Sequence, residues 1–164
     1  MIAAIRNLAN RTALVSSIAG AAIMLVCAVL TGVDIVMRNF FHGGILGMVD
    51  LTQLAMVWAA ALTIPLGFAD NSHISVDLVA ANLPAPLTKA VNILAALCAV
   101  FVLYFCIRWG WAEAARQIGY GDSSMTIGIP VIWYWVPLIF GFALSAVCAL
   151  TSMTAPPDDR IDGL

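Results

Sequence analysis

The chain consists of four long stretches without charged residues, separated by short segments that hold nearly all of the charges. Each stretch reaches the roughly 17–25 residues that an α-helix needs to cross about 30 Å of hydrocarbon. Backbone groups in lipid must be paired within their own segment, and the period-two alternation of a β-barrel is absent. We therefore predict an all-α integral membrane protein with a single domain over residues 1–164. The expected spans are about 12–36, 51–69, 88–108 and 128–150, with a flexible tail over 154–164.

The connections between these spans are short. Residues 38–50 form a glycine-bearing loop, and Trp109–Asp122 is the most polar connection. Residues 74–83, with the sequence ISVDLVAANL, are too short and too polar to cross a bilayer, and Pro84 follows them. This pattern predicts a short helix that lies at the membrane interface between the second and third spans.

Composition supports a membrane location. Of the 164 residues, 63% are hydrophobic and 10% are charged, whereas soluble domains are about 45–50% apolar and about 25% charged. The net charge is -2 without a basic run, so nucleic acid is excluded as a partner. The cysteines lie in apolar runs without a C-x-x-C pair, and we interpret them as small apolar residues that fill helix faces. They are Cys27, Cys98, Cys106 and Cys148.

The centres of all four predicted spans lack charged residues, although transporters that bind ions themselves usually carry polar groups there. There is no Ser/His/Asp set and no metal-binding or nucleotide-binding motif, so we predict neither an enzyme nor a resident cofactor. His42 and His73 lie in connections, which disfavours a haem-binding membrane cytochrome. Two alternative functions stay open: a stand-alone small exporter that acts as a homodimer, and an assembly subunit of a membrane complex.

Two pairs of basic and acidic residues stand one helical turn apart, at the end of the first span and at the start of the interfacial segment. An exposed pair of this kind contributes only about 0.2–1 kcal/mol, so its value is to orient a helix end where a partner subunit or a lipid phosphate can meet it. Two prolines near the start of the fourth span complete the set of candidates. The candidate subunit-interface or membrane-interface residues are Asp34, Arg38, His73, Asp77, Pro130 and Pro137.

Small residues and aromatic residues are also patterned. Every fourth position of the second and fourth spans is small, which predicts close helix packing, and Trp58 is expected to pack inside the second span. Aromatic residues flank the third connection, which predicts an aromatic belt at one membrane face. The small positions are Ala55, Ala59, Thr63, Gly67, Gly141, Ser145 and Ala149, and the belt comprises Trp109, Trp111, Tyr120, Trp133, Tyr134 and Trp135.

From about Asp34 to Leu144 the order of these features resembles the DctQ-like small membrane subunit of tripartite ATP-independent periplasmic (TRAP) transporters. The chain departs from the family pattern before the second span, where Gly47–Asp50 replaces a tryptophan and paired glutamates, and at Asp70-Asn71, which replaces a basic residue. The matching segments are Arg38-Asn39-Phe40-Phe41, Gly67-Phe68-Ala69, His73-Ile74-Ser75-Val76-Asp77, Pro84, Ile127-Gly128-Ile129-Pro130 and Val136-Pro137-Leu138.

The resemblance implies a multi-pass subunit of the bacterial inner membrane with both termini in the cytoplasm. Its partners would be a large permease subunit, which carries the sodium and substrate sites, and a periplasmic binding protein that delivers an organic acid. The small subunit would bind no substrate and would brace the static part of the large one. Charge alone favours this orientation only slightly, with four basic residues inside against three outside.

Overall fold

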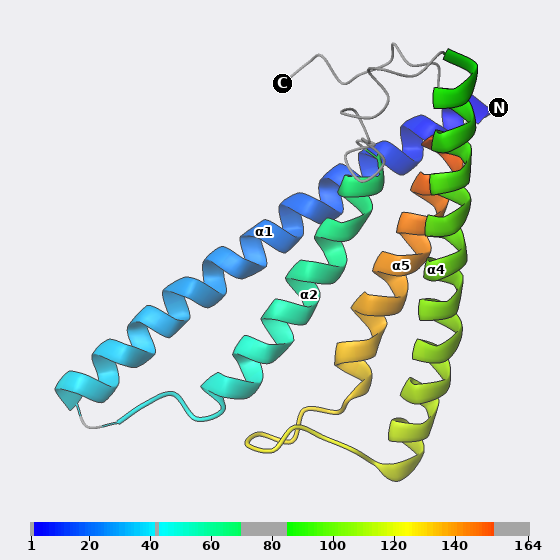
Figure 1. Cartoon of the computed structure of the whole chain (residues 1–164). Coiled ribbons are helices and arrows are strands. Elements are labelled where there is room, and N and C mark those ends of the chain that lie inside the picture. The colour runs from blue at the N-terminus through cyan, green and yellow to red at the C-terminus, as the bar shows by residue number, and fades with distance from the viewer. Residues whose placement is uncertain (1, 42, 70–84, 153–164) are drawn as a thin grey trace.

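The structure, a computed structural model, describes residues 2–41, 43–69 and 85–152, which form four helices joined by two described loops (Figure 1). The helices are α1 (Ile2–Phe41), α2 (Met48–Ala69), α4 (Ala85–Tyr120) and α5 (Ile132–Ser152). Each is long and apolar enough to cross a membrane. The prediction of an all-α membrane protein with four spans is confirmed. The expected interfacial helix and the tail over 154–164 lie outside the described residues.

The helices lie side by side in the order α1, α2, α5, α4, with α1 also touching α5. Both described loops lie at one end of the molecule, opposite the first residues of α1 (Figure 1). α1 meets α2 at Gly20, where a Cβ would come within 2.9 Å of the Ala59 carbonyl oxygen. From this crossing, α1 and α2 diverge toward the loop end (Figure 1).

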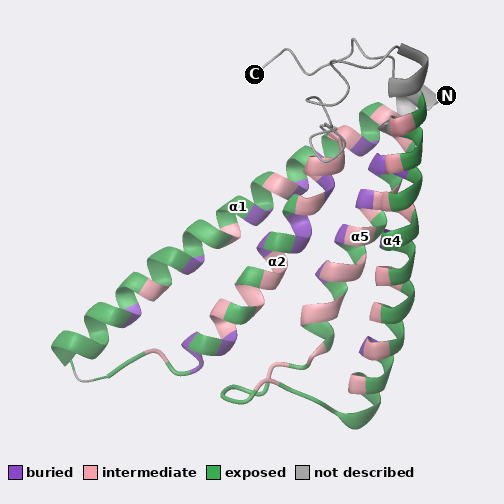
Figure 2. Ribbon diagram, in the orientation of Figure 1, coloured by how far each residue is buried: buried purple, intermediate pink, exposed green. Residues whose placement is uncertain are grey.

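Figure 2 marks the buried residues of the helices in purple; most of these residues are small, whereas many of the large apolar residues are exposed. Ala13, Ala61, Ser145 and Cys148 are fully buried, whereas α4 turns a row of aromatic and aliphatic side chains to the outside. Small residues let helix backbones approach closely and gain dispersion contacts in lipid. This arrangement agrees with the packing interpretation of the small-residue positions, because Ala59, Gly141, Ser145 and Ala149 are buried.

α2 and α5 each contain a buried proline, and each proline leaves one backbone carbonyl of its own helix without the usual donor. Pro137 cannot donate to the Trp133 carbonyl, and the indole Nε1–H of Trp58 on α2 donates to it at 2.9 Å instead. Pro65 likewise cannot donate to the Ala61 carbonyl, which faces Gly141 of α5. Each helix therefore packs against the carbonyl that the proline of the other has left free.

We expect Gly141→Ala to lower the free energy of unfolding by about 1–3 kcal/mol, because its Cβ would overlap the Ala61 carbonyl and force α2 and α5 apart. Tryptophan fluorescence during thermal unfolding in detergent measures the change. Gly32→Ala on α1 is the matched control, since no atom lies within 4 Å of the added Cβ. An equal effect of the two substitutions would contradict close packing at Gly141.

The prediction that Trp109–Asp122 is a connection was wrong for most of its length, because α4 continues to Tyr120. Residues 112–117 (AEAARQ) are strong helix formers, and Glu113 forms an ion pair with Arg116 at 2.6 Å. The helix ends in a Schellman motif: Asp122 N–H donates to the Gln117 carbonyl and Gly121 N–H to the Ile118 carbonyl, both at 3.1 Å. Gly121 has φ +72°, which suits glycine at this position.

Candidate functional site

Two buried carboxylates organise the end of the molecule at which both described loops lie. Asp34, near the end of α1, is 5% exposed, and Asp50, in the first turn of α2, is 3% exposed. A buried carboxylate is costly unless hydrogen bonds or an ion pair satisfy it. Both carboxylates are satisfied by groups of the loops or of the neighbouring helix turn, so each holds a loop against the helices.

Asp34 holds the loop between α1 and α2. Its Oδ1 accepts a hydrogen bond from the Ile45 backbone N–H at 2.6 Å, and its Oδ2 pairs with Arg38 Nε at 2.7 Å. The structure therefore shows the ion pair that the spacing of Asp34 and Arg38 suggests. The pair does not end the helix, because α1 continues to Phe41. Asp34 instead holds the loop that follows α1 against the last turns of this helix.

Asp50 holds the loop between α4 and α5. Its Oδ2 accepts three hydrogen bonds: from Ser124 Oγ–H at 2.6 Å, and from the backbone N–H groups of Thr126 and Ile127 at 2.9 Å each. Sequence reasoning missed this role and placed Asp50 only at the end of the loop that precedes the second span. The available signal was an acidic residue at the start of a helix together with the Ser/Thr-bearing segment 123–126.

The loop between α4 and α5 is itself ordered by local bonds. Ser124 N–H donates to the Ile129 carbonyl, and Ile129 N–H donates to Ser124 Oγ, both at 2.9 Å. Ser123 and Pro130 form an isolated antiparallel bridge, and the Pro130 carbonyl accepts the Trp133 N–H at 3.1 Å as α5 begins. Pro130 thus closes the loop, and the side chain of Met125 at its tip is fully exposed.

Aromatic residues at the start of α5 connect it to two other helices. Tyr134 Oη–H donates to the Asp50 carbonyl of α2 at 3.3 Å, and Trp135 Nε1–H donates to Gln117 Oε1 of α4 at 2.9 Å. Trp133 is half exposed and receives the Trp58 indole on its carbonyl. The belt residues of α5 therefore also fix the helices relative to one another, which their sequence pattern did not reveal.

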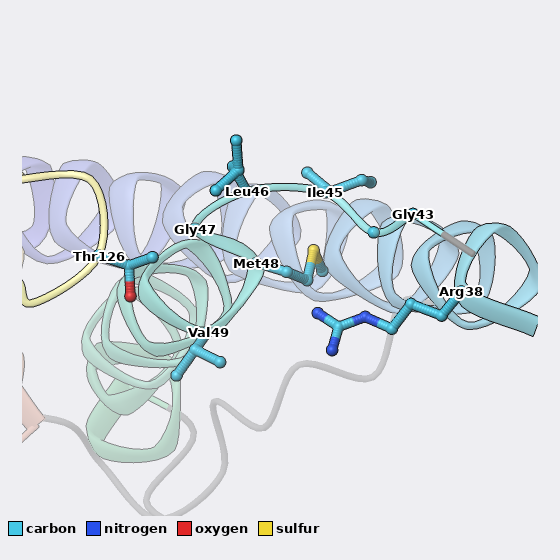
Figure 3. Close-up of a pocket in the computed structure, with 9 residues that line it drawn as sticks. Arg38, Gly43, Ile45, Leu46, Gly47, Met48, Val49 and Thr126 are labelled. Carbon is cyan, nitrogen blue, oxygen red and sulfur yellow. The ribbon is translucent and has the colours of Figure 1, made fainter. Parts of the chain in front are cut away.

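A cavity of about 520 Å³ lies between the two loops and the ends of α1 and α2. Arg38 extends its guanidinium along one side of it toward Met48 (Figure 3). The cavity is lined by Arg38, Gly43, Gly44, Ile45, Leu46, Gly47, Met48, Val49 and Thr126. It presents one cationic side chain and a glycine-rich backbone.

The structure thus brings Asp34 and Arg38 together with the unpredicted Asp50 at one end of the bundle. Pro130 lies in the loop at this end, and Pro137 is buried in α5. His73 and Asp77 lie outside the described residues. Within residues 2–41, 43–69 and 85–152, no group of three or more His, Cys, Asp or Glu side chains could hold a metal ion.

Comparison with known proteins gives two matches. The model of the family described as "Tripartite ATP-independent periplasmic transporters, DctQ component" matches residues 27–155. The chain is also similar to a protein of Haemophilus influenzae that is named as a TRAP transporter small permease protein. The two are 24% identical over 127 residues, which cover 76% of this chain and 77% of that protein. The matched region begins within α1 and includes all of α2, α4 and α5.

Proposed function

Because the chain belongs to the DctQ family of TRAP transporter components, we propose that it is a non-substrate-binding membrane subunit that braces the large permease subunit of a sodium-coupled transporter for an organic acid. The observation that carries the proposal, beyond family membership, is that the centres of all four spans lack charged residues. A charge at the centre of a bilayer costs at least about 2.5–3.5 kcal/mol and is retained where it serves function. The substrate and sodium sites are therefore proposed for the partner chain.

The outer surfaces of the helices support a bracing role. α4 buries few of its residues within this chain, and its outer face carries Leu97, Phe101, Tyr104 and Phe105. Close bonds between α2 and α5 and the two carboxylate-anchored loops fix the helices relative to one another. A fixed bundle with apolar outer faces is suited to pack against the static part of a larger membrane protein.

The proposed setting is the bacterial inner membrane with both termini in the cytoplasm, so that the two described loops face the periplasm. This orientation agrees with the small excess of basic residues on the cytoplasmic side. A periplasmic binding protein would then deliver the substrate on the side of these loops. In this proposal the chain has no enzyme activity and no cofactor, and Asp34, Arg38, Pro130 and Pro137 serve assembly and placement at the membrane interface.

Reconstitution into liposomes tests the proposal. With a sodium gradient and the binding protein outside, we expect organic-acid uptake into liposomes that contain this chain and its large subunit. Liposomes with this chain alone should show no uptake, because the centres of its spans contain no charged residue that could bind an ion or the substrate. Uptake by this chain alone would contradict the proposal and favour a stand-alone transporter.

A kinetic comparison separates bracing from substrate binding in the same liposomes. Arg38→Ala is expected to lower the maximal uptake rate and to leave the concentration for half-maximal uptake nearly unchanged. Arg116→Ala is the matched control, because Arg116 also pairs with a carboxylate and its side chain is 62% exposed against 60% for Arg38. A shift of the half-maximal concentration by more than about tenfold in the Arg38 variant, about 1.4 kcal/mol of binding free energy, would show that this chain contacts the substrate.

A further inference from the structure

An apolar groove of about 500 Å³ runs between α1 and α2 where the two helices diverge. Both walls lie within candidate membrane spans. The wall from α2 runs from Met48 to Trp58, a length of about 15 Å at 1.5 Å per residue. The lining residues are Ala22, Ile23, Val26, Cys27 and Leu30 of α1 and Met48, Leu51, Leu54, Ala55 and Trp58 of α2.

The groove leads to the cavity that holds Arg38. Met48 lines both spaces, so the apolar groove and the cationic cavity adjoin at the first residue of α2. α2 has 22 residues and is about 33 Å long, close to the roughly 30 Å thickness of the hydrocarbon layer. Met48 therefore marks the boundary between hydrocarbon and headgroups, with the groove on the hydrocarbon side and Arg38 at the level of the headgroups.

Arg38 is arranged to receive an anion. Its Nε forms an ion pair with Asp34 Oδ2 at 2.7 Å, which holds the guanidinium beside this carboxylate. In the part of the chain that the structure describes, no bond from its two terminal nitrogens is found, and the group extends along the cavity toward Met48 (Figure 3). A guanidinium with free N–H groups binds phosphate oxygens by charge-assisted hydrogen bonds.

We propose that the two spaces together form a binding site for one membrane phospholipid, with an acyl chain in the α1–α2 groove and the phosphodiester on Arg38. The continuity of the apolar groove with the cavity that holds Arg38 favours a phospholipid over a helix of a partner, because a phospholipid joins an acyl chain directly to an anionic phosphate. The site would be present whether or not the chain braces a permease.

Native mass spectrometry of the full chain in detergent tests the proposal. Phosphatidylglycerol should remain bound, whereas diacylglycerol with the same acyl chains should bind at least about tenfold more weakly, since it lacks the phosphate. Inorganic phosphate should not bind detectably, because it has no acyl chain to fill the groove. Equal retention of phosphatidylglycerol and diacylglycerol, or loss of all lipid from the wild-type chain, would overturn the site.

Two pairs of variants test the two halves of the site. Arg38→Gln and Ala55→Phe, which fills the groove, should each reduce bound phosphatidylglycerol by about tenfold. Arg116→Gln and Ala60→Phe are the controls and should retain it, because Arg116 lies on α4 and Ala60 faces outward from α2. Arg38→Gln leaves the hydrogen bond from Ile45 N–H to the buried Asp34 in place and removes only an exposed side chain, so this variant folds even if the Ala55 variant does not. Retention by Arg38→Gln would overturn the proposal, as would a cross-link from Ala55→Cys to the large subunit in membranes.

Discussion

Replacing Asp50 by alanine is expected to free the loop between α4 and α5 and to speed amide hydrogen exchange at Thr126 and Ile127 by at least about tenfold. One oxygen of this buried carboxylate accepts both of these amides together with the Ser124 hydroxyl. Alanine leaves all three donors without their acceptor at once. We also expect the thermal midpoint of unfolding in detergent to fall by about 5 °C.

Graded substitutions make this expectation specific to the carboxylate. Asp50→Asn keeps an acceptor oxygen but loses the charge, and charge-assisted hydrogen bonds are roughly twice as strong as neutral ones. The exchange rates of Thr126 and Ile127 in this variant should therefore lie between those of the wild-type chain and the Asp50→Ala variant. Asp122→Ala is the matched control, because Asp122 is an exposed acidic residue of the same loop. Unchanged exchange at Thr126 and Ile127 in the Asp50→Ala variant would show that other contacts hold the loop.

The helices could be predicted from the sequence because a span needs an uninterrupted apolar run, and the charged residues mark where each run ends. The same rule failed at the end of α4. Charges mark the edge of the hydrocarbon layer and not the end of a helix, so residues 109–120 continue α4 beyond Arg108. The capping signal at Gly121, which does end the helix, was present in the sequence.

The candidate site was predictable only where its contacts are local. Asp34 and Arg38 are one helical turn apart, so their pairing follows from helical spacing. Asp50 and Ser124 are 74 residues apart, and Trp58 and Trp133 are 75 apart. Contacts of that separation depend on which helices become neighbours, and the apolar pattern of a membrane helix does not encode its neighbour because every face is apolar.

The indole of Trp58 is expected to stabilise the bundle mainly through the carbonyl that Pro137 leaves free. Trp58→Phe keeps most of the apolar surface but removes the indole N–H that donates to the Trp133 carbonyl in place of the missing Pro137 N–H. We expect a loss of about 1–2 kcal/mol in the free energy of unfolding, measured by denaturation in mixed micelles. An unchanged stability would mean that the freed carbonyl finds another donor.

A double-mutant cycle tests the cause of this loss. Pro137→Ala restores a backbone N–H four residues after Trp133, so the carbonyl no longer needs the indole, and Trp58→Phe should then cost less by about 1 kcal/mol. Trp135→Phe is the matched control, because Trp135 donates to Gln117 of α4 and its loss should cost the same with proline or alanine at position 137. If Trp58→Phe costs the same in both backgrounds, the indole acts by packing alone. A measured coupling would instead mean that the proline of α5 and the tryptophan of α2 act as one unit that holds α2 against the first turn of α5.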